Sequence, residues 1–326
     1  NIYYYTITVI NNLLINFNKY YILFLVINMK INLKKWMADF ADDKSLFKMT
    51  IPGSHDCVTQ YVQFPRHFQT QNQNIYEQLN IGIRALDIRV ESKDERLKMV
   101  HGVVKAFCTP NHFGRQMDLE DVLNHCYNFL YENPSEAIIF QFKNDSNSEN
   151  EKCFDNLFYT YIKGNEEKWY TQNRIPTLGE ARGKIVLIRR CKMDMQNKDF
   201  TDDNTGIDFS RWVEQRTAEP HALTLETKSK DNAVFIVQDR FKYKPVERWN
   251  ECLKPFLDSM TEFDGKYIID YTSTAGGLKG PRKNAKIINT FFMGYPLDKE
   301  KYYGTIYLDF PYPELTHKII EHNYNK

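Results

Sequence analysis

Short runs of apolar and β-branched residues recur along the chain, and longer polar stretches separate them. Runs of this kind, bounded by polar or turn-forming residues, predict buried strands. They occupy residues 47–51, 85–90, 97–100, 137–142, 185–188, 235–237, 267–269 and 305–308. The hydrophobic pattern therefore predicts eight strands.

Several of the gaps between these runs carry a helical pattern. In residues 119–131 the apolar side chains recur at helical spacing, and Asn133 and Pro134 then end the helix. Strands that alternate with helices predict an α/β protein with a parallel sheet, and eight such units predict a single (β/α)₈ TIM-type barrel. The gap between the second and third runs is too short for a helix, so we expect a distorted barrel.

The chain shows no internal repeat or low-complexity linker after residue 36, which predicts one domain over residues 36–326. Residues 1–28 differ in character, because their apolar run at 20–27 is far shorter than the ~20 residues that cross a bilayer. Small residues of a signal cleavage site do not follow that run. We expect residues 1–28 to be a leader or a non-native segment outside the fold. The protein is expected to be secreted if this segment acts as a signal, and otherwise cytoplasmic with peripheral membrane association.

Composition narrows the possible partners. Lys plus Arg is 43 and Asp plus Glu is 42, and this balance gives no general attraction to a nucleic acid. The 42% of hydrophobic residues predict a folded chain. The 6 cysteines form no C-x-x-C pair, which argues against a disulfide scaffold and a cysteine-rich zinc site.

Charged or titratable residues end or follow the predicted strands, where a barrel of this class places its chemistry. They are His55, Asp56, Asp87, Arg89, His101, Lys143, Arg190, Asp239 and Asp309. Because the carboxyl ends of the strands meet at one mouth, we expect these side chains to form a ring.

Two histidines near one phosphorus atom can divide the work of a general base and a general acid. Asp56 and Asp309 are placed to hold an imidazole each, and Arg89 offers a planar fork to phosphate oxygens. Lys143, Arg190 and Asp239 suit a polyhydroxylated ring, whose hydroxyls both donate and accept. The pattern indicates a phosphodiester site.

Five sequence blocks together resemble the bacterial-type phosphatidylinositol-specific phospholipase C family, including its X-domain relatives. The blocks are residues 51–56 (IPGSHD), 82–89 (GIRALDIR), 101–102 (HG), 133–139 (NPSEAII) and 178–187 (LGEARGKIVL). The resemblance runs from about Trp36 to the C-terminus, and it implies a distorted (β/α)₈ barrel.

The resemblance also implies the reaction. By residue matching, His55 is the base that takes the proton of the inositol 2-hydroxyl, and His101 is the acid that protonates the departing diacylglycerol oxygen. Asp309 then supports the base and Asp56 the acid, which gives diacylglycerol and inositol 1,2-cyclic phosphate. The expected partner is phosphatidylinositol or a glycosylphosphatidylinositol in a membrane, met by a monomer through peripheral contact.

Other family positions are matched less uniformly. Arg89 matches the phosphate-stabilising arginine with Asp87 as its neighbour, whereas Lys143, Arg190 and Asp239 match inositol-binding positions. Phe241 stands where the family is expected to have a tyrosine that stacks on the inositol ring, so the stacking face is kept and a hydroxyl is lost.

Arg89 also bears on metal use. Calcium-dependent relatives carry Glu-x-Asp on the second strand, whereas this chain has Asp87-x-Arg89, and a guanidinium at a ligand position repels a cation. We expect catalysis without metal or another cofactor. Two alternatives remain: a catalytically silent barrel that binds phosphoinositides, and an enzyme like the glycerophosphodiester phosphodiesterases.

The early loop and a late basic loop are candidate membrane contacts. Tyr61, Phe64 and Phe68 lie between the first two strands, although they could equally pack on the barrel. The basic residues Lys279, Arg282, Lys283 and Lys286 follow the seventh strand, where they could face anionic lipid.

Overall fold

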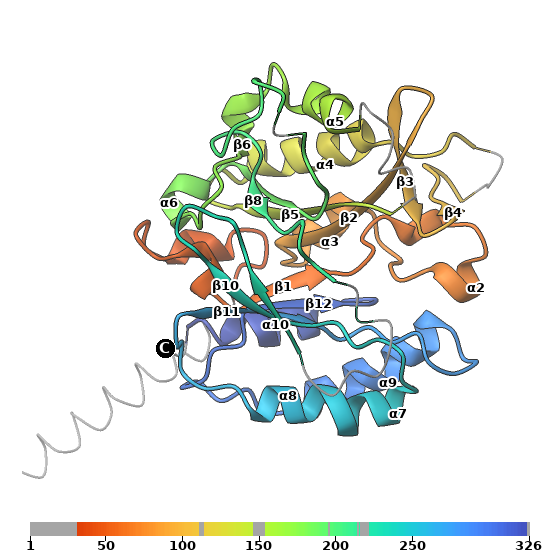
Figure 1. Cartoon of the computed structure of the whole chain (residues 1–326). Coiled ribbons are helices and arrows are strands. Elements are labelled where there is room, and N and C mark those ends of the chain that lie inside the picture. The colour runs from red at the N-terminus through yellow and green to blue at the C-terminus, as the bar shows by residue number, and fades with distance from the viewer. Residues whose placement is uncertain are drawn as a thin grey trace, which may run out of the picture. The chain divides into compact units, whose positions relative to one another are not determined.

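Parallel strands form the centre of the chain, and helices pack around them (Figure 1). The structure is a computed structural model, and it describes residues 31–110, 114–145, 154–194, 196–213, 215 and 222–324. The predicted leader, residues 1–28, lies outside these ranges. Residues 33–326 form one compact unit.

The strands are β1 (Ile51–Ser54), β2 (Ala85–Lys93), β3 (Arg96–His101), β4 (Val104–Lys105), β5 (Ile138–Asn144), β6 (Trp169–Tyr170), β7 (Ile185–Arg189), β8 (Ile207–Asp208), β9 (Leu223–Glu226), β10 (Val234–Gln238), β11 (Lys266–Tyr271) and β12 (Thr305–Leu308). The α-helices are α2 (Pro65–Phe68), α3 (Ile75–Asn80), α4 (Leu119–Glu132), α5 (Phe154–Ile162), α6 (Leu178–Ala181), α7 (Pro245–Arg248), α8 (Lys254–Asp258), α9 (Pro281–Gly294) and α10 (Pro313–Glu321). Short 3₁₀ segments are η1 (Trp36–Asp39), η2 (Leu46–Lys48), η3 (Thr59–Tyr61) and η5 (Glu166–Lys168), and η6 (Trp249–Leu253) is a π-helix.

The sheet follows the barrel order β8-β7-β5-β2-β1-β12-β11-β10 with parallel pairing throughout. Strand β12 pairs with β1, so the two ends of the chain's fold meet in the sheet. On the opposite side β9 pairs antiparallel with β10, and no pairing joins β8 to β9 or β10 within the described ranges. The predicted (β/α)₈ barrel is confirmed. It is distorted, and within the described ranges no strand pairing closes it between β8 and β10.

Two predicted strands differ from the structure. The first lies at Ile51–Ser54 rather than 47–51, because Leu46–Lys48 forms a 3₁₀ turn that places the Phe47 ring against Phe235 in the core. The third run, β3, is no barrel strand: it pairs antiparallel with the far end of β2. Asp94 and Glu95 form the turn between them, with φ of 52° and 55°. β2 therefore pairs directly with β5, and the eighth barrel strand is β8, which lies beside β7 and is too short to give a hydrophobic run.

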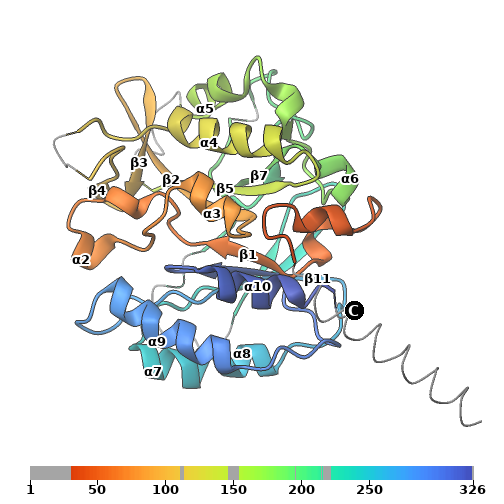
Figure 2. The ribbon, with the colours of Figure 1, turned by 180° about the vertical axis from the view of Figure 1, so that it is seen from behind.

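Helices on both sides bury the outer faces of the strands (Figure 2). Helix α4 has the predicted limits because Asp118 caps its first turn through the amides of Glu120 and Asp121. Its apolar face packs with α3, β2, β5 and β7 in one core cluster. A second cluster lies among α8, α9, α10 and strands β11 and β12.

A buried ion pair closes the end of the barrel opposite the chemistry. The guanidinium of Arg84 pairs with Glu136 at 2.8 Å, and both side chains are fully buried. Arg84 also donates to four backbone carbonyls, those of Leu33, Lys34, Leu79 and Ile83. These two family-like residues therefore serve the fold rather than the reaction.

No helix of the described residues is both long and apolar enough to cross a membrane.

We expect Gly53→Ala to destabilise the fold by about 1–3 kcal/mol, because an added Cβ would lie 2.8 Å from Cδ1 of Tyr307 and 3.1 Å from Cβ of Ala85. Urea unfolding measures the change. Gly294→Ala is the control, since its Cβ meets no atom within 4 Å, and it should leave stability unchanged or slightly higher. Equal effects of the two substitutions would contradict the packing argument.

Candidate active site

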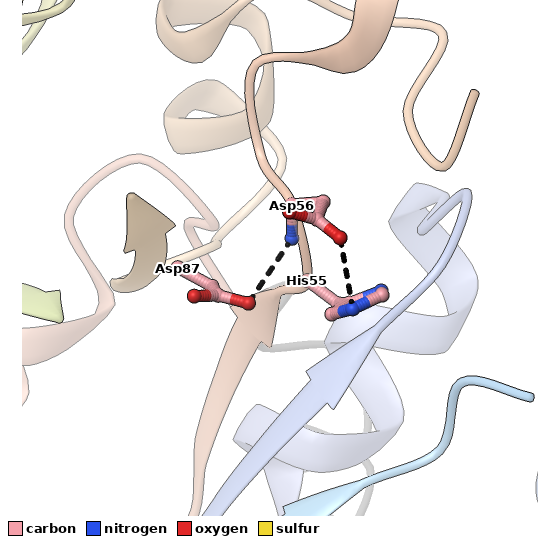
Figure 3. Close-up of side chains that lie close together, drawn as sticks. All are labelled: His55, Asp56 and Asp87. Atoms are coloured by element: carbon pink, nitrogen blue, oxygen red, sulfur yellow. Dashed lines mark hydrogen bonds and ion pairs between the residues drawn. The ribbon is translucent and has the colours of Figure 1, made fainter. Parts of the chain in front are cut away.

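His55 and Asp56 follow β1 at the mouth of the barrel (Figure 3). Nδ1 of His55 lies 2.7 Å from Oδ1 of Asp309, which follows β12. The backbone carbonyl of His55 accepts a hydrogen bond of 2.7 Å from the side-chain amide of Gln71. One ring nitrogen and the backbone of His55 are thus held by neighbouring segments.

Asp56 is the residue that joins the two histidines. Its Oδ2 lies 3.1 Å from Nε2 of His55 and 3.1 Å from Nε2 of His101, and the ring centroids are 6.3 Å apart. Asp56 has a φ of 43°, a left-handed conformation that costs energy for a residue other than glycine. The backbone amide of Asp56 donates to Oδ2 of Asp87, which fixes this turn (Figure 3).

His101 ends β3 and is turned toward the mouth by the β2–β3 hairpin. Nδ1 of His101 lies 2.9 Å from the carbonyl oxygen of Phe68, and Nε2 faces Asp56. Both ring nitrogens therefore face acceptors.

Arg89 lies among three carboxylates. Its Nε is 2.8 Å from Oδ1 of Asp56, and one terminal nitrogen is 2.8 Å from Oδ2 of Asp87. Another terminal nitrogen lies 3.8 Å from Asp145. Burial lowers the pKa of Arg89, but Asp56, Asp87 and Asp145 outweigh it and raise that pKa well above its usual range. The guanidinium is a permanent charge here.

Asp145 was not among the predicted site residues, although it follows the fourth predicted strand. Its Oδ1 lies 2.6 Å from Nζ of Lys143, and its Oδ2 accepts a hydrogen bond of 2.6 Å from the amide of Gly102. Burial raises the pKa of Asp145, whereas Arg89 and Lys143 lower it to about 2. Asp145 thereby links β5, Arg89 and the turn after His101.

The neighbouring charges raise the pKa of His55 and lower the pKa of Asp56. Burial lowers the pKa of His55, but Asp56 and Asp309 outweigh it and raise that pKa to about 10. Burial raises the pKa of Asp56, whereas Arg89, His101 and His55 lower it far below its usual range. At neutral pH His55 is therefore a cation and Asp56 an anion.

The predicted inositol-binding residues are only partly brought to this centre. Burial raises the pKa of Asp239, and Arg190, His55 and Arg89 act against it, which places Asp239 in the field of the site. The guanidinium of Arg190 lies 3.9 Å from the ring centroid of Trp212. Phe241 is partly exposed. Its backbone carbonyl accepts hydrogen bonds from the amides of Tyr243 and Ala275 and from the hydroxyl of Thr274.

His55, Asp56 and Asp87 offer ligand atoms within 4.8 Å of one another, a spacing that could hold a metal ion. The two carboxylates of this group, however, are the ones that Arg89 contacts at 2.8 Å. A divalent ion there would lie against a permanent positive charge. The donor set therefore fits the guanidinium of Arg89 better than a divalent metal ion.

A family model described as "Phosphatidylinositol-specific phospholipase C, X domain" matches residues 48–191. A 1-phosphatidylinositol phosphodiesterase of Listeria monocytogenes is 26% identical over 90% of this chain and 86% of the relative. Another, from Staphylococcus aureus, is 30% identical over 64% of each chain. Residues 48–191 therefore match the X domain of phosphatidylinositol-specific phospholipase C. The resemblance inferred from the five sequence blocks is confirmed.

Solved structures of phosphatidylinositol-specific phospholipase C share the fold. A structure of the S. aureus protein has a TM-score of 0.72 at 23% identity, covering 90% of this chain and 98% of that chain. The L. monocytogenes structure has a TM-score of 0.65 at 23% identity, covering 90% and 99%. The chain therefore has the fold of these solved structures.

Asp309→Asn should destabilise the protein by about 1.5–3 kcal/mol at pH 6, because it removes the charge from a buried hydrogen bond. The pKa of His55 is raised from 6.5 to about 10 in the folded state. Its pairing with carboxylates therefore stabilises fully below pH 6.5 and is lost as the pH rises toward 10. Urea unfolding of both proteins across this range should show the difference shrinking with pH. A difference that grew with pH would contradict the assignment.

Proposed function

We propose that this protein is a phosphatidylinositol phospholipase C that cleaves the glycerol-phosphate ester by attack of the inositol 2-hydroxyl on phosphorus. The products are diacylglycerol and inositol 1,2-cyclic phosphate. One observation carries the proposal: an anionic oxygen, Oδ2 of Asp56, lies 3.1 Å from Nε2 of both histidines. A base and an acid that share one oxygen are spaced to serve a single phosphodiester.

His55 takes the role of base and His101 the role of acid. Asp309 at 2.7 Å holds the His55 ring so that its Nε2 faces the mouth, and the carbonyl of Phe68 orients His101 in the same way. Arg89 stabilises the charge that grows on the phosphate oxygens. Asp87 orients Arg89 through the contact at 2.8 Å.

Binding has to free His55 from one of its two carboxylates. The 2-hydroxyl must meet Nε2 of His55, where Asp56 lies in the free site. Removing that partner removes one of the two charges that raise the pKa of His55, so the pKa falls toward the range in which a base works. Asp56 keeps Arg89 as a partner and stays beside His101, whose Nε2 proton passes to the departing oxygen.

The headgroup would be recognised by Lys143, Arg190 and Asp239, whose charges suit inositol hydroxyls. Free phosphatidylinositol and glycosylphosphatidylinositol share the 2-hydroxyl beside the phosphate, and the reaction accepts either. Arg89 fills the place of a metal ion, so turnover proceeds without one.

His55→Ala and His101→Ala should each lower the rate by at least about 100-fold, because each removes one of the two proton-transfer groups. Phosphorus NMR of phosphatidylinositol vesicles follows the reaction, with His67→Ala as the control for a histidine outside the site. A cyclic phosphodiester signal is expected from the unsubstituted protein. Binding without any new signal would favour the silent barrel. Release of glycerol 3-phosphate from glycerophosphoinositol, with no turnover of phosphatidylinositol, would favour a glycerophosphodiester phosphodiesterase.

The same assay in EDTA tests the role of Arg89. Turnover should be unchanged, since the guanidinium supplies the positive charge. Activity that disappeared in EDTA and returned with calcium would overturn the metal-independent mechanism while leaving the reaction itself intact.

Membrane contact is supported by the loops that follow β1, β10 and β11 at the mouth, here called the mouth loops. They carry the exposed apolar side chains Phe64 and Leu278, and the exposed Val246 lies in α7 directly after the loop that follows β10. The loops abut: a Cβ on Gly280 would lie 2.2 Å from the carbonyl oxygen of Arg66, and one on Gly276 only 1.9 Å from that of Tyr243. Lys279 and Lys283 are exposed beside them and suit anionic lipid.

Replacing both Phe64 and Leu278 by serine should weaken binding to phosphatidylcholine–phosphatidylinositol vesicles about 10-fold or more. The reason is that two apolar side chains are then no longer transferred from water into the membrane. Sedimentation with vesicles measures the binding. Tyr131→Ser on α4 is the matched control, since Tyr131 is 89% exposed but lies away from the mouth loops. Equal loss in the control would argue against docking by these loops.

A further inference from the structure

Tyr271 is a buried aromatic residue that contacts the candidate base. It ends β11, it is fully buried, and its ring meets that of His55 at 5.7 Å between centroids with an interplanar angle of 89°. Such an edge-to-face arrangement is a favoured contact between aromatic rings. Because Tyr271 exposes no surface, it acts on the reaction only through its neighbours.

The His55 ring needs a second constraint. The hydrogen bond from Nδ1 to Asp309 fixes one atom of the ring, and the ring can still rock about it. The other polar contact, from Nε2 to Asp56, is the one that the substrate hydroxyl must replace. During the reaction the contact with Tyr271 therefore remains when the contact with Asp56 is lost.

Tyr271 is itself held rigidly from several directions. Its ring stacks on Tyr307 at 4.6 Å and 11°, and its hydroxyl accepts a hydrogen bond from the side-chain amide of Gln141 on β5. Its carbonyl oxygen accepts hydrogen bonds from the guanidinium of the fully buried Arg248 and from Gln238. A ring with these restraints presents a fixed surface to His55.

We propose that Tyr271 is a positioning residue that fixes the orientation of the His55 ring for proton transfer. The inference rests on the proposed function, in which His55 is the base. A small misplacement of a catalytic group costs on the order of 10- to 100-fold in rate, and binding need not change. The ring of Tyr271, rather than its hydroxyl, carries this role.

The test compares Tyr271→Leu, which removes the ring, with Tyr271→Phe, which keeps it. Tyr271→Leu should lower kcat by about 10- to 100-fold with KM within about twofold, whereas Tyr271→Phe should keep kcat within about threefold. Tyr271→Met refills more of the volume and should behave as Tyr271→Leu does if the latter folds poorly. Melting temperature and circular dichroism establish that each variant is folded.

Tyr267→Leu is the matched control. Tyr267 lies on the same strand, and its ring packs against Phe47 and Phe235 toward the other end of the barrel. This variant should lose stability while keeping kcat. Equal loss of kcat in Tyr267→Leu, unchanged kcat in the folded Tyr271→Leu or Tyr271→Met variant, or equal loss in Tyr271→Phe would each overturn the proposal.

A second readout is independent of turnover. The ring protons of His55, assigned with the His55→Ala variant, should show a ring-current displacement in the NMR spectrum that Tyr271→Phe keeps and Tyr271→Leu loses. An unchanged His55 spectrum in Tyr271→Leu would refute the positioning role. If the unsubstituted protein made no cyclic phosphate, the proposed function would fail, and this spectrum would still show whether the Tyr271 ring contacts that of His55.

Discussion

The charge of one buried carboxylate, that of Asp56, organises the candidate site. An ionised carboxylate removed from water is costly unless nearby cations and donors replace the lost hydration. Arg89, His55 and His101 do so at 2.8, 3.1 and 3.1 Å. Those three side chains come from β2, the end of β1 and β3, so satisfying Asp56 also brings the groups of a phosphodiester reaction together.

The same balance extends outward from Asp56. Arg89 is shared with Asp87 and Asp145, and Asp145 in turn pairs with Lys143 and with the amide of Gly102. Positive and negative groups alternate through this network. Asp56, Arg89 and Asp145 each contact more than one group of opposite charge. A phosphate that enters meets positive groups that are already in place, which is the preorganisation that lowers a barrier of this type.

The irregular parts of the barrel are the ones that complete the site. In a regular barrel each parallel strand is followed by a helix, but here β2 continues into the antiparallel β3, which returns His101 to the level of Arg89. The turn at Asp94 and Glu95 makes this possible. Gly53 contributes in another way, because only a residue without a side chain leaves room for Tyr307, on which Tyr271 stacks.

The amino-acid sequence by itself determined the barrel class and the limits of α4, and it placed His55, Arg89, His101 and Asp309 at strand ends, because hydrophobic period and strand ends are local properties of the chain. Tertiary structure alone decided that Asp56 contacts both histidines, that Asp145 links Arg89 to Gly102, and that β3 leaves the barrel. It also decided the high pKa of His55, which depends on a carboxylate 254 residues away in the chain. Distances, burial and ring orientation arise from pairing between distant strands, and a local pattern carries no information about that pairing.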